Sequence, residues 1–425
     1  MNKNIKLAVA GAVLALSATA DAGIIIPAGD WTLDVNGNVN AFYINNRSKD
    51  SNTIRGGLAN AESNNSTSSS INTGLLPSWL GVTGKSRQND LDVEFTVSLQ
   101  PGASQAKSLG GGGGSEFRQA YLSFGDKSWG SIKIGKDLGV FGSDAILSDM
   151  TLLGVGSQGV VGAAGGTTTT LGRIGAGYMY ADFNGQINYT TPNMSGFQAT
   201  VGIDQPLNTN NLGNRASAAA VTADPVLGIA TANSVAAESV SVNSSGTQRA
   251  PAFVGKASYA WSGDVSGKIW AEAKSQRVDY SASMDERANV WGIGANANVA
   301  GFGLTGYYYD GKGAGTTAFL MDGVDAQGKR RDSDGGYIQA TYVLPTKTKV
   351  GISWGVSKLD RNSGESRTNS ASQLVKENEM TTFGVYHPLT KSVNLVGEYS
   401  RVKSENQAKA NNDSDIISLG GILFF

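Results

Sequence analysis

Few residues of this chain have the types and spacing that catalysis requires. The sequence contains no cysteine and one histidine, His387, which directly precedes Pro388. A hydrolase needs a nucleophile with a general base beside it, and a histidine before a proline at a predicted short turn is poorly placed for that role. Asp332 and Asp334 could suggest metal or glycosidase chemistry, but they follow three basic residues at 329–331, which favours a solvated charge cluster.

Cofactor and nucleic-acid chemistry also find little support. Gly84-Lys85-Ser86 resembles the end of a phosphate-binding loop, yet Trp79 occupies the position of the required first glycine and no helix pattern follows. A single histidine without cysteine nearly excludes a metal site, and the net charge of -1 removes the electrostatic argument for nucleic-acid binding. We therefore expect no enzymatic activity, no cofactor, no metal and no nucleic-acid partner.

The N-terminus predicts export. Lys3 and Lys6 precede an apolar run over residues 7–16, and small residues end it at Ala20-Asp21-Ala22. The run is too short for a membrane-spanning helix, which needs about 20 residues. Residues 1–22 are therefore predicted to be a cleaved signal peptide, and residues 23–425 to form one mature domain.

The elements that position the polar residues are short strands. Segments of about ten residues alternate between apolar and polar positions, as transmembrane strands do. In the first, Leu33, Val35 and Val39 share one face, and Asp34 and Asn38 share the other. The sixteen predicted segments are 32–44, 77–85, 91–100, 116–125, 129–137, 178–191, 197–204, 252–261, 265–279, 288–299, 302–310, 335–344, 349–359, 380–387, 393–402 and 415–425.

The connections between these segments are alternately short and long. Short turns such as 126–128, 192–196 and 300–301 separate polar, low-complexity loops, notably 45–76, 138–177 and 205–251. Outer-membrane barrels place short turns in the periplasm and long loops outside. The pattern predicts an all-β protein, a transmembrane antiparallel barrel with a polar, water-filled interior, located in the cell outer membrane.

The sequence resembles the general diffusion porins of Gram-negative bacteria. The resemblance covers the mature chain and rests on the terminal Phe425 and on the segments 117–121 (FRQAY), 129–135 (WGSIKIG), and 187–192 (INYTTP) followed by Gly196-Phe197. It implies a homotrimer of 16-stranded barrels in which the third extracellular loop, here 138–177, folds into the pore.

The resemblance also implies where the pore narrows. Asp144 and Asp149 would be the acidic members of the constriction loop, and Arg118 would stand on the opposite wall. Strand parity adds Lys133, on the next strand, to the predicted constriction. The loop motif of the family is absent, and the nearest text is Phe141-Gly142-Ser143-Asp144.

Strand parity predicts further residues that line the pore. The basic ones are Lys85, Arg118, Lys133, Lys256, Lys268 and Lys274, and the acidic ones are Asp34, Asp182, Glu272 and Glu398. Because basic residues exceed acidic ones, a transverse field with a mild preference for anions is expected. The predicted function is passive diffusion of ions and small hydrophilic solutes.

Two alternatives remain open at this point. The first is a channel selective for small organic anions or sugars, and the second is a secreted β-rich adhesin. Outer-membrane lipid and lipopolysaccharide are the expected surroundings of a barrel, and the basic cluster at 329–331 is a candidate contact for lipopolysaccharide.

Overall fold

The computed structural model describes residues 23–59, 66–107, 110–112, 115–158, 169–209, 221–223, 230–232, 241–365 and 370–425. The predicted signal peptide, residues 1–22, lies outside the described residues.

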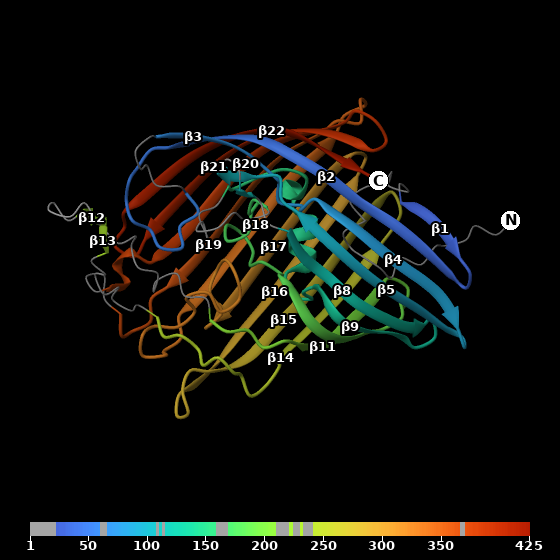
Figure 1. Cartoon of the computed structure of the whole chain (residues 1–425), viewed down its shortest axis with the longest axis horizontal. Helices are drawn as coiled ribbons and strands as arrows, with labels where there is room; N and C mark the ends of the chain where they lie inside the picture. The colour runs from blue at the N-terminus through green and yellow to red at the C-terminus, as the bar shows by residue number, and fades with distance from the viewer. Residues whose placement is uncertain are drawn as a thin grey trace.

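Sixteen antiparallel strands form a closed barrel, as predicted (Figure 1). Each strand pairs with the next along the chain, and β22 returns to β2, where Asn38 faces Phe424. The barrel strands are β2 (Trp31–Ser48), β4 (Trp79–Gln88), β5 (Leu91–Pro101), β8 (Ser115–Asp126), β9 (Gly130–Leu138), β10 (Phe183–Thr190), β11 (Phe197–Asp204), β14 (Ala252–Trp261), β15 (Val265–Asp279), β16 (Asp285–Val299), β17 (Phe302–Lys312), β18 (Asp332–Val343), β19 (Lys349–Asp360), β20 (Val375–Pro388), β21 (Val393–Asn406) and β22 (Asn411–Phe424).

Two shorter strands extend the seam at β2. β1 (Ile24–Ala28) pairs with the start of β2, and β3 (Thr67–Asn72) pairs with its end. The two edges of β2 have different partners. One edge pairs first with β4 and then with β3, and the other pairs first with β1 and then with β22. β1 therefore continues the line of β22 below Phe425, whose N–H and carbonyl both bond to Gly37.

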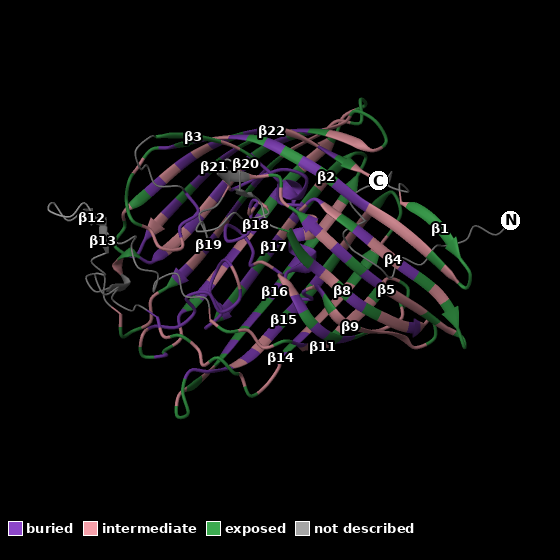
Figure 2. Cartoon of the chain, viewed as in Figure 1, coloured by how far each residue is buried: buried purple, intermediate pink, exposed green. Residues whose placement is uncertain are grey.

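Side chains alternate between the two faces of the wall, which gives the banding of exposed and buried residues in Figure 2. On β2, Val39 and Tyr43 are exposed whereas Asn38 and Asn40 are buried. The exposed face of the barrel is apolar, as contact with lipid requires. The inner face is polar, and much of it is covered by loops that fold inward.

The tight turns have a clear conformational cause. Asn89 and Asp90 between β4 and β5, and Ala300 and Gly301 between β16 and β17, all have positive φ. Two consecutive residues of this kind form the type I′ turn, whose twist matches that of an antiparallel pair. Asn, Asp and Gly tolerate this conformation at small cost, which explains their use at these positions.

Several strand boundaries agree with prediction and one does not. β11, β14 and β15 have the predicted limits, and most other strands extend a few residues beyond theirs. The sixth strand was predicted from Tyr178 but begins at Phe183. The preceding residues belong to the loop, because Tyr178 is fully buried inside the barrel and bonded there.

The loops carry the remaining elements. α1 (Ser143–Ser148) and η2 (Met150–Leu153) lie between β9 and β10, and η4 (Ser370–Gln373) precedes β20. Two small hairpins stand outside the barrel sheet, namely β6 (Gln105–Lys107) with β7 (Gly110–Gly112) and β12 (Val221–Ala223) with β13 (Ala230–Ala232). No helix among the described residues is long and apolar enough to cross a membrane.

Candidate functional site

The loop between β9 and β10 enters the barrel and packs on its inner wall. A bond from the Gly139 N–H to the Asp182 carbonyl closes its neck. α1 then lies against the wall, where the Tyr337 hydroxyl on β18 donates to the Ala145 carbonyl at 2.8 Å. Gln339, also on β18, accepts from the Met150 N–H at 2.9 Å and donates to the Ser148 carbonyl at 2.6 Å. These contacts fix the first half of the loop across the lumen from its own root.

The second half of the loop is held by a buried carboxylate. Glu398 on β21 accepts from the N–H groups of Val155 at 2.8 Å and Gly156 at 2.9 Å, and from the Tyr386 hydroxyl at 2.7 Å. Gly154 allows this approach, because a Cβ there would lie 2.1 Å from a Glu398 oxygen. The loop therefore meets the wall far around the barrel from β9.

The return segment of the loop is also anchored. The Arg173 guanidinium is fully buried and donates to the Met380 carbonyl on β20 at 2.9 Å. The N–H of Gly177 donates to the Ser357 hydroxyl on β19 at 3.0 Å. Together with the contacts on β18 and β21, these bonds hold the loop inside the lumen, where it reduces the open cross-section.

Asp144 is the charged centre of α1. It lies 2.9 Å from the Lys256 ammonium on β14 and also pairs with Lys268 on β15. Lys256 donates in addition to the Ser143 hydroxyl at 2.9 Å. Burial acts to raise the pKa of Asp144, but the two lysines outweigh it and bring that pKa below its ordinary value. Asp144 therefore stays ionised and ties the loop to the wall.

Asp149 has a different place from the expected one. Its carboxylate caps η2 by accepting from the Thr151 N–H at 2.9 Å and the Thr151 hydroxyl at 2.6 Å, and it accepts from the Tyr178 hydroxyl at 2.9 Å. Only 1% of Asp149 is exposed. Burial and this carboxylate both raise the pKa of Tyr178, which stays protonated as the donor. Asp149 thus stabilises the loop from within and does not face the pore.

Arg118 lies on β8, four strands along the wall from β14, which carries the Lys256 partner of Asp144. It bonds to Glu116 at 2.8 Å, approaches the Tyr180 hydroxyl at 3.4 Å and stacks over the Phe183 ring at 5.5 Å. These contacts pack Arg118 against the return segment of the loop. Burial there raises the pKa of Tyr180 to about 12. Between Arg118 and the loop is a cavity of about 300 Å³, whose walls include Leu138, Leu147 and Leu152.

The sequence comparisons decide the family. A model described as Gram-negative porin matches residues 7–407. The chain belongs to the Gram-negative porin family. No curated protein matches it by sequence.

Solved porins share the fold at low identity. An anion-selective porin from Comamonas acidovorans is 16% identical, with a TM-score of 0.59 over 93% of this chain and 100% of that one. The outer-membrane channel DcaP of Acinetobacter baumannii is 12% identical, with a TM-score of 0.63 over 94% and 99%. OmpT of Vibrio cholerae in its trimer form is 12% identical, with a TM-score of 0.53 over 93% and 99%. The chain is thus an outer-membrane β-barrel channel protein.

A second group of charges lines the porin wall from β4 to β9. Lys85 pairs with Glu94 at 3.6 Å, and Glu94 accepts from the Tyr121 hydroxyl at 3.2 Å. The Lys133 ammonium lies 4.5 Å from the centre of the Tyr121 ring and pairs with Asp137. Parity had predicted Lys85 and Lys133 on the inner face, and the structure joins them through Glu94, Tyr121 and Asp137 in one connected network.

Three other predicted lining residues are less accessible. Lys274 points inward but forms a buried pair with Asp204 at 2.8 Å. Glu272 is 4% exposed and accepts from the Tyr307 hydroxyl at 2.8 Å. Asp182 has positive φ and accepts the Phe183 N–H at the start of β10. The inner faces of these strands are covered by loops, so inward parity alone did not distinguish a pore-lining residue from a buried one.

Sequence reasoning missed the residues that anchor the loop. Arg173, Tyr178, Tyr337, Gln339 and Tyr386 were not singled out. The last three occupy inward positions on β18 and β20, so parity could have placed them on the inner face. Nothing in the aperiodic loop marked Arg173 or Tyr178. Among the described residues no cluster of three or more His, Asp or Glu could hold a metal ion.

Proposed function

We propose that this porin is a water-filled channel for passive diffusion of ions and small hydrophilic solutes, with a mild preference for anions. The supporting observation is that the basic side chain is more exposed than its acidic partner in most ion pairs of the lumen. Exposed side-chain fractions are 52% for Lys85 against 15% for Glu94, and 32% for Lys133 against 10% for Asp137. At α1, Lys256 and Lys268 are 19% and 29% exposed against 9% for Asp144.

The charges exposed to the lumen are therefore mainly positive, although each ion pair contains about as much negative as positive charge. A permeating ion interacts most strongly with charges in contact with pore water, because buried carboxylates are partly neutralised by their partners. The pair of Arg118 and Glu116 is the exception, since Glu116 is 50% exposed and Arg118 only 11%. This opposite pair keeps the expected preference for anions mild.

Reversal potentials in a salt gradient across a planar bilayer test this proposal. The wild-type channel should favour chloride over potassium modestly, and the double variant K85Q/K133Q should lose most of that preference. K127Q is the matched control, because it removes one lysine charge from the turn between β8 and β9. Clear cation preference in the wild type would reject the anion preference, and failure to conduct would reject the channel itself.

The cavity beside Arg118 supports a second candidate, a channel that selects small organic anions. Its aliphatic walls and the adjacent guanidinium would suit a solute with a carboxylate and an apolar body. Liposome swelling with sugars and dicarboxylates of equal size separates the candidates. Equal rates support general diffusion, and a marked advantage for the dicarboxylates supports selection.

We further propose that the chain assembles as a homotrimer. The trimer form of OmpT, an outer-membrane protein of Vibrio cholerae with this fold, supports the assignment, and migration as a heat-sensitive oligomer on a gel would test it.

A further inference from the structure

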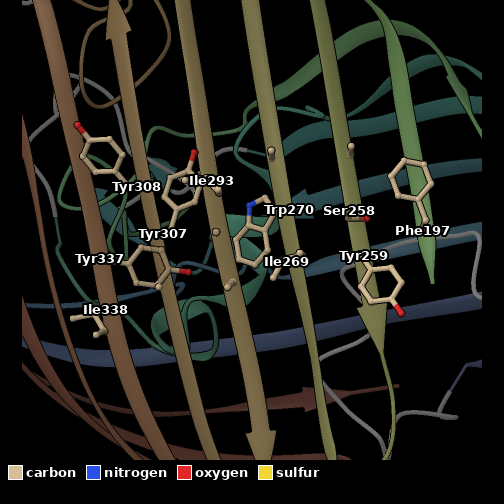
Figure 3. Close-up of a pocket in the computed structure, with 15 residues that line it drawn as sticks. Phe197, Ser258, Tyr259, Ile269, Trp270, Ile293, Tyr307, Tyr308, Tyr337 and Ile338 are labelled. Atoms are coloured by element: carbon tan, nitrogen blue, oxygen red, sulfur yellow. The ribbon is translucent and has the colours of Figure 1, made fainter. Parts of the chain in front are cut away.

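The outer face of the barrel carries a hollow over β14 to β18. It encloses about 800 Å³, and Phe197 and Tyr259 stand at one end while Tyr308 and Ile338 stand at the other (Figure 3). A hollow of this size falls within the range of small-molecule sites. It lies on the exposed apolar face of the wall, outside the lumen.

The sequence register explains the hollow. Ala257 on β14 faces Ala271 on β15, and Ala295 on β16 faces Gly306 on β17. These four small residues form a diagonal floor across four neighbouring strands. A Cβ added at Gly306 would meet no heavy atom within 4 Å, so the space above this part of the floor is open.

Larger side chains border the floor on both sides. Tyr259 and Ile269 lie along one side, and Ile293 and Tyr308 lie along the other. Ile269 and Ile293 are 49% and 54% exposed, so they project from the wall as ridges. The result is a trough whose shape matches an extended hydrocarbon chain. Because the trough faces the membrane, lipid is what it meets.

The same strands carry cations at the end where the long loops lie. Arg277 on β15 and Arg287 on β16 face each other directly in the sheet, and both have the outward parity of the trough residues. Like charges placed opposite each other destabilise a sheet unless something compensates them. A third arginine, Arg249, joins this group through Asp279 and Asp285.

The arginines exceed the carboxylates that they contact. Arg277 bonds to Asp285 at 2.7 Å and approaches Asp279 at 3.6 Å, and Arg249 pairs with the same two aspartates. Arg287 is exposed and donates to the Ser275 hydroxyl at 3.2 Å. Arg249 and Arg277 thus share two carboxylates, and Arg287 adds a positive charge that no carboxylate in the group contacts. Guanidinium groups bind phosphate strongly and in defined geometry.

The spacing between the two features agrees with one lipid. Six residues separate Ala271 from Arg277, which is about 20 Å along a strand. A strand tilt of ~40° turns this into a depth of about 15 Å. That is roughly half of the ~30 Å hydrocarbon core, the thickness of one leaflet.

We propose that this surface is a binding site for lipopolysaccharide, with a lipid phosphate at Arg277 and Arg287 and an acyl chain in the trough. The inference goes beyond the proposed channel function and depends only on the orientation of the barrel in the outer membrane. A second copy of the chain is the less favoured occupant, because copies inserted in the same orientation carry their arginines at the same depth, and a symmetric contact would bring these like charges together.

The test titrates refolded, lipopolysaccharide-free protein in detergent with purified lipopolysaccharide, and bound lipid is counted by native mass spectrometry. R277Q/R287Q should raise the apparent Kd about tenfold or more, since it removes two charge-assisted contacts. A295F/G306F should raise it severalfold by filling the trough. R401Q and A340F are the matched controls, and both should bind as the wild type does.

Arg401 suits this comparison because it is a rim arginine, 45% exposed and paired with Asp413 on the far side of the barrel. Ala340 is a lipid-facing alanine outside the trough lining. Unchanged binding in both test variants would overturn the proposal, as would equal binding of phosphatidylglycerol. Loss of the oligomer in A295F/G306F with lipid binding intact would assign the trough to a second copy instead. Channel conductance is recorded for every variant, and it should stay at the wild-type level whether or not the lipid site exists.

Discussion

The carboxylate of Glu398 on β21 bonds to the N–H of Val155 in the inserted loop, at 2.8 Å and across 243 residues of sequence. The loop tip is thus held by one side chain of the opposite wall. In E398L the N–H groups of Val155 and Gly156 lose their acceptor, which costs about 1–3 kcal/mol for each buried group left unsatisfied. We expect larger and noisier single-channel currents. E398Q keeps an acceptor oxygen and should lie between the two, and quiet wild-type currents in E398L would contradict the anchoring role.

Removing the acid of α1 should strengthen anion preference. In D144N the cations Lys256 and Lys268 remain in the lumen without their carboxylate, so the accessible positive charge increases. The reversal potential in a salt gradient should shift further toward that of chloride. D413N, which removes an acid at the outer rim, is the comparison that should leave selectivity unchanged. A shift toward cations in D144N would contradict the geometry.

The Asp144 carboxylate also determines how low the pH can fall before the loop loses its ion pairs with Lys256 and Lys268. Its pKa is lowered in the folded protein, so the stabilisation by Lys256 and Lys268 is fully present above the ordinary value of 3.8 and is lost as the pH falls through the lower folded value. The contribution of Asp144 should therefore be lost below about pH 4, where channel noise should rise. Recording D144N over the same range provides the control, since its noise should lack that acid-dependent step. An equal rise below about pH 4 in the wild type and in D144N would contradict the role of Asp144.

The alternation of the wall predicts a strong asymmetry between its faces. Ile269 on β15 is 49% exposed on the lipid side. Lysine there should destabilise the barrel by about 2–4 kcal/mol if the residue lies near the bilayer midplane. N298K, on the inner face of β16, should be much milder because Asn298 is exposed there and an ammonium group can reach water. Denaturant unfolding in lipid vesicles measures both, and equal losses would contradict the assignment of faces.

The barrel could be predicted because every strand meets two different environments. Lipid on one side and polar contacts on the other make apolar and polar residues alternate along each strand, and this alternation can be seen in single strands such as β11 and β15. The loop interior has no such constraint. Asp144 lies on the inserted loop, but its partners Lys256 and Lys268 lie more than 100 residues away, and their contact depends on how the loop packs. The same packing buries Asp149, whose type and position in the sequence resemble those of Asp144.

The seam between β2 and β22 joins residues 38 and 424, which are almost as far apart as this chain allows. Until β22 arrives, β2 and β21 present unpaired edges, and such edges invite association with other chains. Contacts of this sequence separation also form slowly. The unclosed sheet therefore depends on protection during transit, and truncation near the C-terminus should harm assembly far more than loss of an equal length from an external loop.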